Sequence, residues 1–413
     1  MRAGSAPATP AAPDGGRLSP RQWLVFGLCF AVVLLDGVDT AAIGYLAPAL
    51  MAEWGVQKAQ LGPVLGAALA GLTCGSLAAG PLADRFGRRR PILAAVLLFG
   101  LASIGAACSA DLAQLTAWHF VTGIGLGAAM PNAVTLMSET CPAARRATLT
   151  NAMFCGFPLG AALGGVLAAW MVPHWGWRSV LLAGGIAPLL LAASLAAWLP
   201  ESPRFAQAAG HPDGAGGAGL ALVLAPRYRL GTVMLWLAYF MGLVIFYSLV
   251  NWMPVLFREA GLAPRQATLV AALFPLGGIG AVAFGWLMDR YDGDRIIAAG
   301  FALTALAVFA IGQVVDHLGL LVPAVLVSGI LMNTAQSSLP ALAAGFYPTA
   351  CRASGVAWML GIGRLGGIAG SFMVAQMSAM QFGFTTILDV LALPGLFAAA
   401  FLLAKRAFRQ TPR

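Results

Sequence analysis

Twelve runs of about 20 mostly apolar residues follow one another along the chain, and this feature limits the fold more than any other. They cover residues 22–47, 60–82, 91–109, 112–136, 147–171, 178–199, 229–255, 267–288, 296–315, 318–345, 352–378 and 382–404. A helix of this length crosses the hydrocarbon core of a bilayer. The chain has 413 residues, of which 60% are hydrophobic and 9% charged, too apolar a composition for a soluble globule. We therefore predict an all-α polytopic membrane protein with twelve transmembrane helices.

The positive charges predict how these helices are oriented. If the N-terminus is cytoplasmic, 19 of the 24 lysines and arginines lie on the cytoplasmic side, as the positive-inside rule requires. Both termini are then cytoplasmic, and the expected location is a bacterial-type inner membrane. The net charge of +9 and the stretch GRRRP at 87–91 also suit a nucleic-acid patch, but a position between two spanning helices favours the topological interpretation. Residues 1–20 lack an apolar core and are predicted to be a disordered tail, not a signal peptide.

The second half of the chain repeats the first. The stretch GPLADRFGRRRP from Gly80 matches GWLMDRYDGDRI from Gly285 at an offset of 205, and the segment from Cys141 matches the one from Tyr347 at an offset of 206. Since six helices separate the copies, the two halves are parallel, an arrangement in which transporters place their site between the halves near the midplane. We expect six-helix halves at 21–200 and 228–405, a linker at 201–227 and a C-terminal tail at 406–413.

This repeated loop resembles the signature of the major facilitator superfamily, and the likeness covers residues 20 to 405. The resemblance implies the fold and says little about the substrate. Acidic and basic side chains at helix ends form bonds that hold in one conformation and break in another. The alternative is that the arginines only fix topology. The candidate gating residues on the cytoplasmic side are Asp84, Arg85, Arg88, Glu139, Arg146, Asp289, Arg290 and Arg352, with Arg145 or Arg146 as the partner expected for Glu139.

Two acidic residues interrupt the first apolar run, in LLDGVDTAAIGY. A charge at the centre of a spanning helix costs roughly 2.5–3.5 kcal/mol on insertion scales, so such residues are functional candidates by default. Asp36 and Asp39 lie roughly 20 and 24 Å into the helix, on one face of it. A carboxyl in a low-dielectric cavity holds a proton readily, as a proton carrier must. The alternative is a structural pair bonded to neighbouring helices.

Arg364 lies near the middle of the eleventh run, in GIGRLGG, and needs an anion. That anion is Asp36 or Asp39, or the carboxylate of a substrate, and both pairings are compatible with different stages of one transport cycle. His119 in the fourth run is as compatible with a core histidine as with a functional one. Asp389 in the twelfth run has no partner that the sequence identifies.

The stretches LLDGVDT, TGIGLGAAMPN, LPESPRF and GIGRLGG together resemble the aromatic acid:proton symporter family, and the seventh run is similar to its hydroxyphenylpropionate transporters. The resemblance implies import of aromatic carboxylates, and it implies transport roles for Asp36, Asp39, Asp84, Asp289, Glu139, Arg352 and Arg364. Where family members often have arginine in the fourth helix, this chain has His119, which puts an anion-binding role there in doubt.

The residues support the same mechanism. An inside-negative potential opposes entry of a monoanion by about 2.3 kcal/mol per 100 mV, so uptake needs a cotransported proton. The aspartates provide proton sites, and Arg364 a bidentate carboxylate site. His119 and the helix 1 aspartates are further candidates for substrate contact, and the other candidates are Tyr239, Trp252, Asn251, Asn333 and Gln336. Gly123 and Gly127, in GIGLGAA, are read as a close helix contact because no strand precedes them.

The main alternative is a proton-coupled exporter of drugs or organic acids with the same fold. Against it, Phe157 precedes Pro158 in the fifth run, where antiporters of this superfamily usually have Gly-Pro. An enzyme would need a nucleophile or metal constellation, and the sequence has no such motif, no Walker sequence and no cofactor motif. We expect a monomer whose partners are an aromatic carboxylate, protons and the lipid bilayer.

Overall fold

The computed structural model describes residues 18–141, 149, 152–201, 222–280, 291–347 and 352–410. In these residues twelve α-helices make up the fold. The first six are α1 (Pro20–Trp54), α2 (Lys58–Phe86), α3 (Arg89–Ala107), α4 (Leu112–Thr140), α6 (Gly156–Trp175) and α7 (Trp177–Trp198). The second six are α10 (Pro226–Glu259), α11 (Pro264–Leu276), α13 (Gly293–Gln313), α14 (Leu318–Phe346), α15 (Arg352–Ala379) and α16 (Phe384–Gln410), and a short 3₁₀ helix, η2 (Gly277–Gly280), follows α11.

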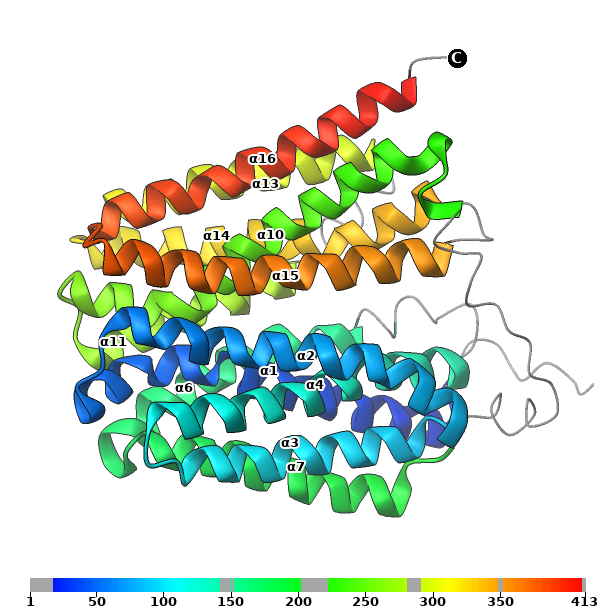
Figure 1. The fold of residues 1–413 in the computed structure, drawn as a ribbon, viewed down its shortest axis with the longest axis horizontal. Coiled ribbons are helices and arrows are strands. Elements are labelled where there is room, and N and C mark those ends of the chain that lie inside the picture. Colours follow the sequence, from blue (N-terminus) through cyan, green and yellow to red (C-terminus); the bar gives the residue numbers. More distant parts are fainter. Residues whose placement is uncertain are drawn as a thin grey trace, which may run out of the picture.

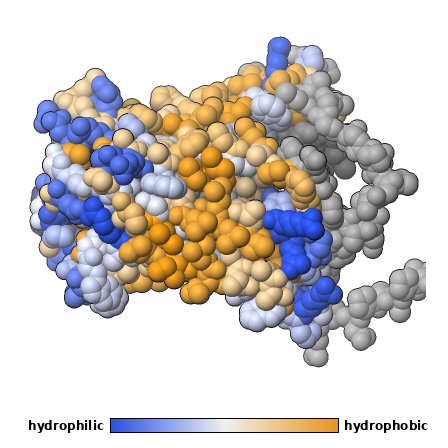
Figure 2. Space-filling model, turned by 60° about the horizontal axis from the view of Figure 1, so that its bottom comes forward, coloured by the Kyte–Doolittle hydropathy of each residue, from blue (hydrophilic) through white to orange (hydrophobic). Residues whose placement is uncertain are grey.

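Eleven helices in the described residues are long and apolar enough to cross a membrane. The remaining predicted span, 267–288, is described as far as residue 280, where α11 and η2 lie. Figure 2 shows an apolar belt around the middle of the molecule, with hydrophilic residues gathered toward its two ends. The prediction of a multi-pass helical membrane protein is confirmed.

The two sets of six helices repeat the same packing. In the first set α1 packs on α6, α2 on α4, and α3 on α4 and α7; in the second, α10 packs on α15, α11 on α14, and α13 on α14 and α16. Figure 1 shows the first set as the lower layer and the second as the upper layer. The layers meet through α2 with α15, α6 with α11, and α1 with α10. The predicted division into parallel halves follows this repeat, and most of the expected linker, residues 202–221, lies outside the described residues.

The start of α1 and the end of α16 lie at the same end of the bundle, on the right in Figure 1. We call this the terminal end and the other the opposite end. The sequence placed the end of the first helix too early, because α1 continues to Trp54 and stops at Gly55, a left-handed cap with φ 63°. The helix α16 runs to Gln410 and so continues into the segment expected as the C-terminal tail.

Glycines set a close helix contact in the first half. A Cβ on Gly123 or Gly127 of α4 would overlap the carbonyl oxygens of Ala68 or Leu72 of α2. The predicted close contact at these two glycines is confirmed. The small residues therefore let the backbones of α2 and α4 approach each other closely.

Candidate substrate and proton site

Arg364 lies in a stretch of α15 where glycines let this helix pack closely against α10. A Cβ on Gly363 would overlap the Tyr239 ring, and one on Gly366 would overlap the Phe240 carbonyl oxygen. The two backbones therefore approach more closely than any larger residue would allow. From α10, the Tyr239 hydroxyl interacts electrostatically with the Arg364 guanidinium.

The Arg364 guanidinium reaches across to the other half of the molecule. It donates a hydrogen bond to Ser76 Oγ of α2, and Ser76 Oγ lies 2.8 Å from the Leu72 carbonyl oxygen and 2.9 Å from that of Gly127. Among the described residues, no carboxylate forms an ion pair with Arg364. A guanidinium carries five N–H donors, so this half-buried group retains donors for an external anion.

Asp36 faces the same space from α1. Its side chain is buried, and it accepts a hydrogen bond from Thr40 Oγ1 at 3.0 Å. The Asp36 carboxyl and Arg364 interact electrostatically, and the buried Tyr247 of α10 interacts with both. The structure thus brings together an acid from the first half, a guanidinium from the second and two tyrosines. Since Asp36 and Arg364 are not in direct contact, each is available to a different partner.

Asp39 points to different neighbours. Its carboxyl is buried and lies 3.1 Å, through Oδ1, from Ser103 Oγ of α3. Ser103 Oγ also lies 3.1 Å from the Leu181 carbonyl oxygen of α7, and Asp39 Oδ2 has no hydrogen-bond partner in the described part of the chain. The two aspartates, adjacent on one helix, are therefore bonded differently: Asp36 faces Arg364, and Asp39 faces the packing of α1, α3 and α7.

The other predicted substrate residues differ in whether their polar side-chain atoms already have hydrogen-bond partners. Gln336 of α14 donates weakly to the Tyr239 carbonyl oxygen at 3.4 Å, and its buried Oε1 has no partner among the described residues. By contrast, Asn251 Nδ2 donates to Ser371 Oγ at 3.0 Å, and the fully buried Trp252 donates to the Ser371 carbonyl oxygen at 3.1 Å. Both of these join α10 to α15 within one half.

Asn333 and His119 make no recorded contact with Arg364 in the described part of the chain. Asn333 Nδ2 donates to the carbonyl oxygens of Phe274 and Gly329, at 3.0 and 2.8 Å. It stabilises the contact between α14 and the end of α11. His119 is buried in α4, 3% exposed, and no ion pair to it occurs within the described ranges.

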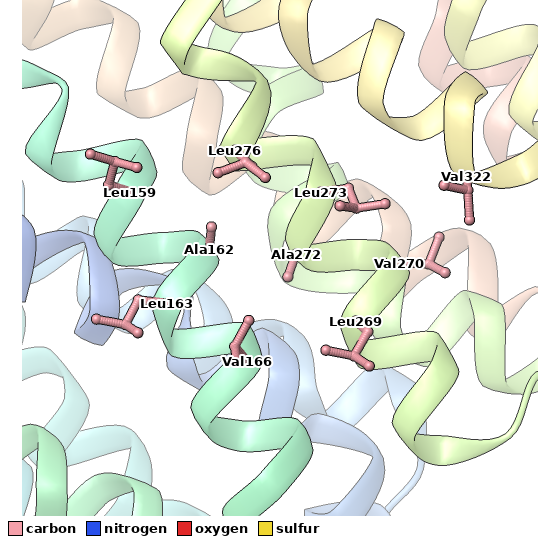
Figure 3. A pocket seen from close by; sticks show the side chains of 10 residues that line it. All are labelled: Leu159, Ala162, Leu163, Val166, Leu269, Val270, Ala272, Leu273, Leu276 and Val322. Carbon is pink, nitrogen blue, oxygen red and sulfur yellow. The ribbon is translucent and has the colours of Figure 1, made fainter.

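A cluster of aromatic rings lies at the interface between the two halves. The Phe157 ring of α6 lies 6.3 Å from that of Phe246 of α10, which in turn lies 5.1 Å from Tyr247 and 6.0 Å from Phe274. Farther along the same contact, α6 and α11 border a groove of about 420 Å³ lined by aliphatic side chains such as Leu163 (Figure 3). The described residues that line this groove are all apolar, whereas Tyr247 of the aromatic cluster interacts electrostatically with Asp36 and Arg364.

The terminal end of the first half holds part of the predicted gating network. Arg88 Nε lies 3.8 Å from Glu139 Oε2, which joins the start of α3 to the end of α4. The side chains of Asp84, Arg85 and Arg352, and all of Arg146, Asp289 and Arg290, lie outside the described residues. That part of the prediction is therefore not tested.

Glu201 also belongs to this network, although its sequence context did not indicate a gating role. Its Oε1 accepts hydrogen bonds from the backbone N–H groups of Arg88 and Arg89, at 2.7 and 3.2 Å. The carboxylate thus binds the N-terminus of α3, where unpaired donors and the helix dipole favour an anion. The sequence shows the motif PESPR. It does not show that Glu201 of this motif contacts Arg89, 112 residues earlier, because that contact depends on the tertiary fold.

At the opposite end an ion pair joins the two halves. Lys58, the first residue of α2, pairs with Glu259, the last residue of α10. A second pair, Arg178 with Glu53, lies at the same end but within the first half, and Trp177 Nε1 also donates to Glu53 at 2.7 Å. The opposite end is therefore closed across the halves by at least one charged contact.

The helix repeat and the intramembrane charges agree with a family comparison. The model of the Major Facilitator Superfamily matches residues 28–371. The chain belongs to this superfamily. In overall structure the chain is similar to a D-xylose-proton symporter, with a TM-score of 0.74 over 92% of this chain and 97% of the other, at 19% identity. That likeness concerns the fold alone.

Relatives with higher identity carry names that specify aromatic acids. The chain is 44% identical to the 4-hydroxybenzoate transporter PcaK of Pseudomonas putida over 94% of this chain and 93% of the relative. It is 41% identical to a gallate transporter of Pseudomonas putida, covering 97% and 95%. It is 36% identical to the 3-(3-hydroxy-phenyl)propionate transporter of Escherichia coli (strain K12), covering 95% and 97%. The resemblance to aromatic acid transporters noted from the sequence is confirmed.

Proposed function

We propose that this protein is a proton-coupled symporter that imports hydroxylated aromatic carboxylates, with hydroxybenzoates preferred, by alternating access. The observation that carries the proposal is the central arrangement of Arg364 and Asp36, which interact without forming an ion pair. The names of the relatives, hydroxybenzoate and gallate transporters among them, support the substrate class.

In this mechanism the substrate carboxylate binds to Arg364, whose planar fork matches a carboxylate. The ring then lies against Tyr239 and Tyr247, whose hydroxyls interact electrostatically with the guanidinium. The orphan Oε1 of Gln336, next to Tyr239, is a suitable acceptor for a ring hydroxyl, since a buried acceptor without a donor costs about 1–3 kcal/mol. Asn251, Asn333, Trp252 and His119 then act in packing instead of in substrate contact.

The helix 1 aspartates carry the proton. Asp36 senses the substrate through Arg364, and Asp39 lies one helical turn away in a buried site. A proton bound with the monoanion removes the electrical cost of about 2.3 kcal/mol per 100 mV. The terminal end is then cytoplasmic in a bacterial inner membrane, in agreement with the excess of lysine and arginine there. The protein functions as a monomer, because the site lies within one chain.

Counterflow in proteoliposomes tests the proposal. Vesicles loaded with unlabelled 4-hydroxybenzoate are diluted into labelled 4-hydroxybenzoate, and we expect a transient overshoot of label. Net uptake should depend on an inwardly directed proton gradient. No counterflow with any hydroxybenzoate or phenylpropanoate would overturn the substrate class. Accumulation driven only by an outwardly directed proton gradient would instead identify an exporter.

A further inference from the structure

We propose that Ser103 is a positioning residue that couples the proton on Asp39 to helix α7. In the proposed protonated state, the Asp39 carboxyl donates to Ser103, and Ser103 donates to the Leu181 carbonyl oxygen. When the proton leaves, the Ser103 hydroxyl turns to the carboxylate and releases α7. This inference rests on the proposed function in one respect only, that Asp39 gains and loses a proton during transport.

The geometry gives Ser103 two acceptors at equal distance. Ser103 Oγ lies 3.1 Å from Asp39 Oδ1 and 3.1 Å from the Leu181 carbonyl oxygen, and the Ser103 side chain is 1% exposed. A serine hydroxyl has a single proton to donate but also accepts hydrogen bonds. It cannot donate to both oxygens at once. The contact with Asp39 is complete in both directions only if the carboxyl supplies the second proton.

The surroundings of Asp39 oppose an ionised carboxylate. Its other oxygen, Oδ2, is buried without a partner in the described residues, and a buried charge with so few donors is costly. On its own helix, Asp36 is the neighbouring ionisable group. From the helices packed against α1, namely α2, α4, α6, α7 and α10, and from α3, the described residues bring no charged side chain into interaction with Asp39; the polar group that faces it is Ser103.

Glycines of α7 make this three-helix contact possible. A Cβ on Gly184 would lie 3.4 Å from Ser103 Oγ and 3.7 Å from Asp39 Oδ1, and one on Gly185 would meet the Gly100 carbonyl oxygen of α3 at 2.7 Å. The small residues allow α7 to approach α3 closely enough for the Leu181 carbonyl, one turn earlier, to reach Ser103. The Ser103 hydroxyl is thus the polar link between α1 and α7.

Proton release changes this link without breaking any covalent bond of Ser103. The O–H bond of the Asp39 carboxyl breaks and its proton goes to water. The Ser103 O–H then rotates from the Leu181 oxygen to the new carboxylate, a charge-assisted bond that is stronger than a neutral one. Since α7 loses a tie to α3 in the same step, the protonation state of Asp39 is transmitted to the packing of the first half.

Infrared difference spectroscopy of the full-length protein in proteoliposomes, recorded across a pH step without substrate, tests the proposal directly. We expect a protonated-carboxyl C=O band that Asp39→Asn abolishes. Ser103→Ala should shift that band to higher frequency because it removes the hydrogen-bond partner, and Ser103→Thr should restore it. Ser328→Ala is the matched control, a fully buried serine of α14 whose hydroxyl has no partner among the described residues.

Transport provides the second measurement. Ser103→Ala should lower proton-driven accumulation of 4-hydroxybenzoate by about tenfold, equivalent to about 1.4 kcal/mol, while counterflow stays within about twofold of wild type. A band that survives Asp39→Asn, or one that Ser103→Ala leaves unshifted, would overturn the proposal. If Ser103→Ala does not fold, Ser103→Cys, with a weak S–H donor, must shift the same band. A wild type that transports no aromatic acid would refute the proposed function but leave the infrared test of Ser103 intact.

Discussion

At the scale of single residues, the centre of the molecule contains two different carboxyl sites on one helix. Asp36 interacts with Arg364 and Tyr247, and Asp39 bonds to Ser103. The sequence predicted both aspartates and the arginine, because an ionisable residue inside an apolar run is costly and therefore conspicuous. It did not predict Ser103, since placing a serine in an apolar run costs little free energy and is common. Its role depends on which helices lie beside it.

The first prediction concerns Arg364→Lys. The variant keeps the charge but loses the two-pronged guanidinium, so affinity for 4-hydroxybenzoate should fall by about 1–3 kcal/mol, measured by calorimetry on purified protein. The amide analogue should bind wild type much more weakly than the acid. Arg258→Lys is the control, because Arg258 is exposed at the end of α10. A wild type that binds acid and amide equally, with a lysine variant of unchanged affinity, would remove Arg364 from the binding site.

The second prediction separates the aspartates. Asp36→Asn and Asp39→Asn should each abolish concentrative uptake, because each removes a titratable group while preserving shape. Only Asp36→Asn should also change substrate affinity, since Asp36 interacts with Arg364 and Asp39 does not. Uptake assays and calorimetry on the same preparations measure the two effects. If both variants accumulate substrate as wild type does, the proton path does not run through α1.

At the scale of helices, close approach depends on glycine positions that the sequence reveals only in part. The pair Gly123 and Gly127 was identified by its spacing, and the contact with α2 follows from it. The face that joins α15 to α10 was visible only as a glycine-rich stretch around Arg364. Which of those glycines touches another backbone depends on the rotation of the helix, and that is set by the whole bundle.

The third prediction compares two glycines of α15. Gly366→Ala should lower the thermal unfolding temperature in detergent, because the Cβ would overlap the Phe240 carbonyl oxygen and overpacking costs about 1–3 kcal/mol. Gly361→Ala, with no heavy atom within 4 Å of the added Cβ, should be neutral or stabilising by about 0.4–1 kcal/mol. Equal unfolding temperatures for the two variants would show that α10 and α15 accommodate the added Cβ without loss of stability.

At the scale of the whole molecule, the ion pair Lys58–Glu259 connects the halves at the opposite end. Composition and the repeat predicted the two halves, because apolar runs and internal matches are local features. The pairing across them could not be predicted, since Lys58 and Glu259 are 201 residues apart and meet only in one arrangement of the halves. In that arrangement the ion pair joins the two halves at the opposite end. Alternating access requires this contact to break in the conformation that opens that end.

The fourth prediction follows from this requirement. Lys58→Ala or Glu259→Ala should increase the population separated at the opposite end. The increase should be at most about fivefold, because a partly exposed pair (25% and 34% exposed) contributes about 0–1 kcal/mol. Distances between spin labels placed on the two halves at that end measure the populations, and high salt should produce a similar change in wild type because it screens exposed charges.

The exchanged pair, Lys58→Glu with Glu259→Lys, decides whether the interaction itself is responsible. It should restore the wild-type distance distribution, because the attraction between the halves is retained with its polarity reversed. Glu53→Ala is the matched control, since its ion pair with Arg178 lies at the same end but within one half, so the distance between halves should not change. If the exchanged variant stays separated, or if Glu53→Ala separates the halves as much as Glu259→Ala does, the Lys58–Glu259 pair does not hold this end closed.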